Sequence, residues 1–147
     1  MFSQTTDYAL RSVAHLANCR EGETTVPEMA QAIQVNVPYL RKVINKLCDA
    51  GIVAAQRGKG GGIRLQADPD ELTILDVVNA TEPMQRIESC PLGLPDHMKL
   101  CSLHAELDDA VALVEKALGS RTIGQLLATR RSPARCGFPK SEELHQL

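Results

Sequence analysis

Aromatic side chains are scarce in this chain of 147 residues, which contains no Trp, two Tyr and two Phe. The core must therefore be built from aliphatic side chains. No apolar run approaches the roughly 20 residues that a membrane-spanning helix needs. The N-terminal stretch also lacks the apolar segment and small-residue cleavage site of a secretion signal. These absences predict a cytoplasmic protein without a membrane partner. The length suits one compact domain with an appendage, or a small domain plus a dimerisation helix.

Neither sign of charge dominates the chain, since its formal net charge is −2. The charges are nevertheless unevenly distributed. Residues 1–66 carry eight Lys/Arg against five Asp/Glu, whereas residues 67–147 carry eight against thirteen. A basic N-terminal half is a weak signal of nucleic-acid binding, and it gains weight only where the charges share one face.

Cysteine occurs five times, as Cys19, Cys48, Cys90, Cys101 and Cys136. An odd number in a reducing compartment argues against a disulfide framework. Metal binding, redox sensing and simple burial remain as alternatives. Cys19 and Cys48 flank the apolar stripes of helices, where cysteine packs as a small apolar residue.

The first half of the chain predicts the order helix, short helix, turn, helix. Apolar residues recur at helical spacing over residues 5–19. Thr25 and Glu28 have the spacing of a capping box that opens a short second helix. A third helix is predicted over residues 38–49, and Gly51 ends it in a left-handed conformation.

Two short strands follow, joined by a glycine-rich turn at residues 57–62. Beyond them the pattern predicts a short helix, an irregular loop and a second long helix with one apolar stripe. The ranges are 52–56 and 63–65 for the strands, 73–80 for the short helix, 82–100 for the loop, 102–118 for the long helix and 122–128 for a final helical turn.

The helix over residues 38–49 is suited to lie in a DNA major groove, as the second helix of a helix-turn-helix does. Its apolar stripe can dock on a core while its polar front faces outward. Arg41 can offer a planar fork to a guanine edge, and Lys42 and Lys46 can reach bases or phosphates. Tyr39 can hydrogen-bond a phosphate. A basic helix face taken alone is more often simply solvated.

The hairpin turn offers a second set of DNA contacts. Glycines from Gly60 onward let the backbone approach a sugar-phosphate surface, beside Lys59. Arg57 is placed to enter a minor groove, whose negative potential attracts arginine. Thr25 completes the predicted DNA-binding set. The turn lacks the Gly-x-x-x-x-Gly-Lys-Ser/Thr pattern of a nucleotide-binding loop.

Five motifs together resemble a known family. They are Thr-Asp-Tyr-Ala-Leu-Arg at 6–11, Val-Pro-Tyr-Leu at 37–40, Arg-Gly-Lys-Gly-Gly-Gly at 57–62, Thr-Ile-Leu-Asp-Val-Val at 73–78 and Cys-Ser-Leu-His at 101–104. Over about residues 1–130 the chain is similar to the Rrf-two family of bacterial winged-helix transcription regulators, which includes IscR-, NsrR- and CymR-like proteins.

The resemblance implies a mainly α fold and a homodimer that binds a roughly palindromic DNA operator as a repressor, and it does not imply an enzyme. It places the family's base-reading positions on Arg41 and Lys42 and its minor-groove arginine on Arg57. It divides the chain into a winged helix-turn-helix domain (1–80), a sensory loop (81–101) and a dimerisation helix region (102–130). The remaining residues, 131–147, are rich in Arg, Pro and Lys, and this composition predicts a disordered tail.

Sensory members of the family hold an iron–sulfur cluster with three cysteines in the loop before the dimerisation helix. Cys90 and Cys101 match the first and last of these, but the middle cysteine is absent. His104 matches a position where IscR-like members use histidine. Two thiolates and an imidazole suit a mixed-ligand 2Fe–2S cluster better than 4Fe–4S, and they also suit zinc.

A further ligand is then required, and the resemblance offers several. His97 or Asp96 can replace the missing thiolate, and Asp7 matches the position from which NsrR-like members supply a carboxylate across the dimer. The alternatives without a metal stay open: the two cysteines can form a thiol switch, or the loop can be empty. A small molecule or a partner protein, as in CymR-like members, would then be the effector.

Overall fold

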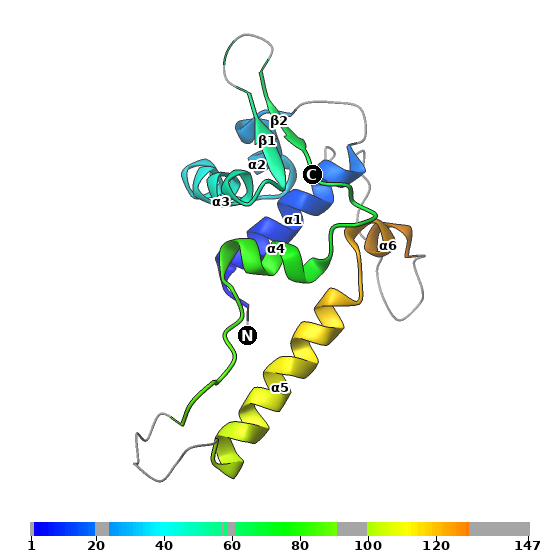
Figure 1. The fold of residues 1–147 in the computed structure, drawn as a ribbon. Helices are drawn as coiled ribbons and strands as arrows, with labels where there is room; N and C mark the ends of the chain where they lie inside the picture. The colour runs from blue at the N-terminus through cyan, green and yellow to red at the C-terminus, as the bar shows by residue number, and fades with distance from the viewer. Residues whose placement is uncertain (1, 20–23, 57, 59–60, 91–99, 130–147) are drawn as a thin grey trace.

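The computed structural model of the chain describes residues 2–19, 24–56, 58, 61–90 and 100–129. The described residues are mostly helical with one small antiparallel hairpin (Figure 1), which confirms the predicted fold class. In chain order the elements are α1 (Gln4–Asn18), α2 (Val26–Ala32), α3 (Val37–Asp49), β1 (Val53–Ala55), β2 (Ile63–Leu65), α4 (Ile74–Thr81), α5 (Ser102–Gly119) and α6 (Ile123–Ala128).

Local capping interactions set the helix ends that the sequence predicted. Thr25 and Glu28 form a complete capping box at the start of α2, with the Thr25 N–H donating to Glu28 Oε2 at 2.8 Å. After α3, Gly51 has a φ of 73°. The Ile52 N–H donates to the Leu47 carbonyl at 2.9 Å across this glycine, which is the Schellman arrangement.

The core lies where α1, α3 and α4 meet beneath the hairpin, and aliphatic side chains fill it as expected. α1 contacts α3, α4 and the second strand. The hairpin pairs Val53 with Leu65 and Ala55 with Ile63. Residues with no exposed surface include Ala9, Val13, Met29, Leu40, Leu47, Val77 and Ile123.

The two C-terminal helices, α5 and α6, differ in how they pack against the rest of the chain. The long helix α5 packs against α4 but buries none of its own residues. It extends away from the core in Figure 1. By contrast, α6 returns to the core, because Ile123 is fully buried and its N–H donates to the Leu72 carbonyl at 2.9 Å. None of the helices in the described part of the chain has the length and apolarity to span a membrane.

Candidate nucleic-acid interface and metal site

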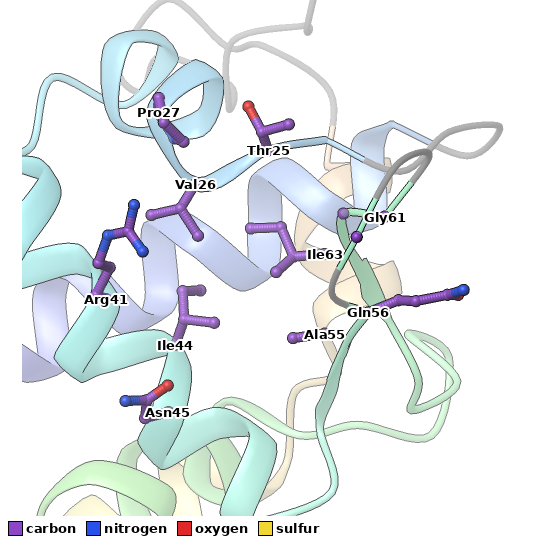
Figure 2. Close-up of a pocket in the computed structure, with 12 residues that line it drawn as sticks. Thr25, Val26, Pro27, Arg41, Ile44, Asn45, Ala55, Gln56, Gly61 and Ile63 are labelled. Carbon is purple, nitrogen blue, oxygen red and sulfur yellow. The ribbon is translucent and has the colours of Figure 1, made fainter.

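A groove of about 550 Å³ lies between α2, α3 and the hairpin. Arg41 and Asn45 line it from α3, one helical turn apart, and Figure 2 shows the Arg41 side chain rising from α3 toward α2. Ile44 and Ile63 supply apolar walls. The groove thus combines apolar walls with two exposed polar side chains from α3, the Arg41 cation and the Asn45 amide.

The predicted DNA-binding side chains of α3 fall into two groups. Arg41 and Lys42 are exposed on its outer surface. Lys46 is exposed too, but its ammonium donates to the Thr81 carbonyl at 2.8 Å, on the side of α3 that faces α4. Lys46 therefore differs from Arg41 and Lys42, because its ammonium makes a hydrogen bond to α4.

Two other predicted contacts are engaged within the chain. The Tyr39 hydroxyl lies 2.6 Å from the Thr5 hydroxyl, and its ring meets Tyr8 edge-on with centroids 5.5 Å apart. The Thr25 hydroxyl donates to Glu28 Oε2 at 2.8 Å within the capping box. Both side chains are held in fixed orientations near the helix-turn-helix.

The predicted wing contacts Arg57, Lys59 and Gly60 lie outside the described residues. The residues around them close the hairpin. The Gln56 N–H donates to the Gly62 carbonyl at 2.9 Å, and the Gly61 N–H donates to the Gly58 carbonyl at 3.0 Å.

Sequence reasoning missed Asn45 and Gln56 as candidate contacts. Both are exposed and line the groove. Asparagine and glutamine amides can pair with the major-groove edge of adenine. A signal for Asn45 was present, because it stands four residues after Arg41 and so shares its helix face.

Cys90, Cys101 and His104 come together as the candidate metal site, with their ligand atoms within 4.8 Å of one another. Nδ1 of His104 lies 3.1 Å from the Cys101 sulfur and 3.7 Å from the Cys90 sulfur. Cys101 is the N-cap residue of α5 and His104 lies in its first turn. Cys90, only 8% exposed, arrives from the irregular segment that follows α4.

The surroundings of Cys101 favour its thiolate form. Its pKa is lowered to about 7, first by the backbone N–H of His104 at the helix start and then by the His104 ring. Thiolate sulfur and imidazole nitrogen are ligands that zinc and iron–sulfur clusters accept. The donor set therefore fits either group as three of the four ligands.

The predicted further ligands are not part of this group. Asp7 pairs with Arg11 at 2.7 Å on α1, and in this single chain it is not among the three grouped donors. Asp96 and His97 lie outside the described residues.

The comparisons with known proteins agree with this architecture. Residues 2–129 match the family model described as Rrf2, iron-dependent transcriptional regulator. CymR, the global cysteine regulator of B. subtilis, is 27% identical with a TM-score of 0.71, over 86% of this chain and 95% of that one. Oxidized Staphylococcus aureus CymR is 20% identical with a TM-score of 0.72, over 90% and 99% of the respective chains. T. potens IscR is 20% identical with a TM-score of 0.71, over 90% and 93%. The winged-helix chain therefore belongs to the Rrf2 family of transcription regulators.

Proposed function

We propose that the chain is a repressor that binds a specific DNA operator as a homodimer, with α3 in the major groove and the hairpin against the adjacent minor groove. The observation that carries this proposal is the two-sided character of α3. Leu40 and Leu47 are fully buried beneath it, while Arg41, Lys42 and Asn45 are exposed on the opposite side. In this role Arg41 and Asn45 would read base edges and Lys42 would neutralise phosphate.

Thr25 and Tyr39 would contribute phosphate contacts beside this helix, each with its hydroxyl already oriented by an internal hydrogen bond. Arg57, Lys59 and Gly60 would make the wing contacts. Lys46 is a weaker candidate, because its ammonium already satisfies the last turn of α4.

The experiment begins by selecting an operator from random duplex DNA with the full-length native protein. Arg41→Ala should then weaken binding to that operator by about 10- to 100-fold, as expected for loss of one base-reading arginine. Arg121→Ala is the matched control, since Arg121 is an exposed arginine in the turn before α6. Equal affinity of the Arg41 variant and the native protein would contradict the assignment of α3.

The dimer is supported by the outer face of α5. Leu103, Leu107 and Leu113 are 64%, 49% and 69% exposed, and the helix buries no residue of its own. Apolar side chains gathered on one exposed helix mark an interaction surface, and a second copy of the same helix is the occupant most consistent with an operator of two half-sites.

The sensory part of the proposal is a metal or cluster held by Cys90, Cys101 and His104. A 2Fe–2S cluster with mixed ligands suits this donor set, and zinc also suits it. The fourth ligand would come from Asp7 of the partner subunit or from Asp96 or His97. Iron, sulfide and zinc contents of anaerobically purified protein decide among these groups, together with the visible spectrum.

A thiol switch is the second candidate for the same residues. It is favoured by the proximity of the Cys90 and Cys101 sulfurs, which lie within the 4.8 Å group. Protein that contains neither metal nor sulfide but forms a reversible Cys90–Cys101 disulfide would support it. Protein that contains no metal or sulfide and forms no Cys90–Cys101 disulfide would favour a small molecule or a partner protein as the effector.

A further inference from the structure

Two carboxylates of α5 pair with Arg86 on the segment that carries Cys90, and Asp108 makes closer contacts than Glu115, whose Oε2 lies 3.5 Å from Nη1. Arg86 donates to Asp108 twice, from Nε to Oδ1 at 2.7 Å and from Nη2 to Oδ2 at 2.5 Å. The backbone N–H of Ile87 donates to the same Oδ1 at 2.8 Å. The Asp108 side chain is only 14% exposed. Asp108 therefore fixes both a side chain and the backbone of this segment.

Asp108 and its partner Ile87 lie a few residues from two of the three candidate ligands, His104 and Cys90. Asp108 lies four residues after His104, so the two side chains share one face of α5. Cys90 follows Ile87 by three residues and places its sulfur 3.7 Å from His104 Nδ1. Figure 1 shows the segment leaving α4 and descending toward the N-terminal end of α5.

No regular structure holds Cys90 in place, because residues 82–90 form neither helix nor strand. At its beginning the segment is fixed by the Met84 N–H, which donates to the Asn79 side chain at 3.1 Å. Among the described residues, the bonds at Asp108 are the fixed point nearest to Cys90 along the segment.

The surroundings of Asp108 favour its ionised form. Its pKa is lowered to about 2, because hydrogen bonds from Arg86, and after them the one from Ile87, stabilise the carboxylate. The side chain is therefore ionised throughout the neutral range, where it can accept all three bonds at once.

We propose that Asp108 is a positioning residue that holds residues 86–90 in the register bringing the Cys90 sulfur to Cys101 and His104. This inference deepens the proposed function, since it concerns how the metal or thiol site is assembled. An ion pair with a guanidinium as exposed as that of Arg86 would alone contribute little to stability. A carboxylate that fixes the backbone next to a ligand instead controls ligand geometry, as outer-shell groups of metal sites do.

The decisive experiment measures the approach of the two sulfurs without any metal. Metal-free protein is treated with diamide, whose N=N bond takes up the two thiol hydrogens as the sulfurs join, so that the oxidant becomes a hydrazine. Trypsin cleaves after Arg86, Lys99 and Lys116, so the disulfide links peptide 87–99 to peptide 100–116. Mass spectrometry then follows the linked pair over time, and a non-reducing gel separates bonds within one chain from bonds between chains.

Asp108→Asn should slow formation of the bond within one chain by about tenfold, because the segment loses its fixed register. Asp109→Asn, at the adjacent exposed position on α5, is the matched control and should react like the native protein. A rate for Asp108→Asn within twofold of the control would overturn the proposal. Asp108→Ala provides a second variant, and circular dichroism shows whether each variant keeps its helices.

A second readout uses zinc alone as the probe. Competition against a chromophoric chelator should show about tenfold weaker zinc binding for Asp108→Asn than for Asp109→Asn, as for other outer-shell substitutions. If the native protein binds no zinc, the zinc alternative of the proposed function fails, while the disulfide rates still decide the role of Asp108. Equal zinc affinity in both variants would also contradict the positioning role, as equal disulfide rates do.

Discussion

Replacing Gly51 with alanine tests the backbone geometry that ends α3. Gly51 has a φ of 73°, and no heavy atom lies within 4 Å of the position that a Cβ would take. The substitution therefore creates no clash, and its effect is purely conformational. A left-handed conformation costs a residue with a Cβ about 1–2 kcal/mol, and the stiffer unfolded chain returns about 0.4–1 kcal/mol. We expect the free energy of unfolding to fall by about 1 kcal/mol.

Urea denaturation followed by circular dichroism measures this change. With a denaturant slope of about 2 kcal/mol/M, the midpoint should fall by about 0.5 M. All samples need equal protein concentration, because the stability of a dimer depends on it. Gly119→Ala is the control, and it should raise the urea midpoint instead. Gly119 is the last helical residue of α5, and a Cβ there would lie 3.4 Å from Leu75 Cδ2. An unchanged midpoint for Gly51→Ala would show that the Schellman geometry does not determine the end of α3.

Two further predictions concern α5. Leu107→Glu should convert the dimer to monomer, because it places a charge in the apolar face on which the second copy would pack, and sedimentation velocity measures the change. Asp108 has a folded pKa of about 2, below its ordinary value of 3.8, so its pairing with Arg86 stabilises the protein above about pH 4, and this contribution is lost as the pH falls toward 2. The difference in Tm between native protein and Asp108→Asn should accordingly shrink over that interval, and a constant difference down to pH 2 would contradict it.

Features that depend on neighbouring residues could be predicted from the sequence. The capping box at Thr25 and the left-handed Gly51 are both present, because each depends on a few residues close in the chain. The two-sided character of α3 also follows from local periodicity. The grouping of Cys90, Cys101 and His104 came from the family resemblance, since a loop of ten residues between the cysteines leaves their separation in space undetermined.

Features that depend on distant contacts could not be predicted in this way. Ile123 is fully buried in the core, because α6 packs against α1, yet the sequence showed only a final helical turn there. Asp108 had no distinguishing signal on α5, because its partners lie 21 and 22 residues away. In both cases the pattern predicted the element but not what it contacts, since periodicity shows which face is apolar and does not identify the neighbour.

Lys42 and Lys46 show most clearly what the sequence alone cannot distinguish, since both are exposed lysines on α3. Only Lys46 has a fixed partner among the described residues, the Thr81 carbonyl at 2.8 Å. If Lys42 neutralises a phosphate, Lys42→Ala should lower the slope of log affinity against log salt by about 1.

Lys46→Ala should instead leave that slope unchanged and lower the urea midpoint, because it removes the cation that satisfies the last turn of α4. Fluorescence anisotropy of labelled operator at several salt concentrations measures both slopes. A drop in slope for Lys46→Ala equal to that for Lys42→Ala would show that Lys46 leaves Thr81 to contact DNA. The lysine would then exchange one acceptor for another, and the last turn of α4 would lose its cation when DNA binds.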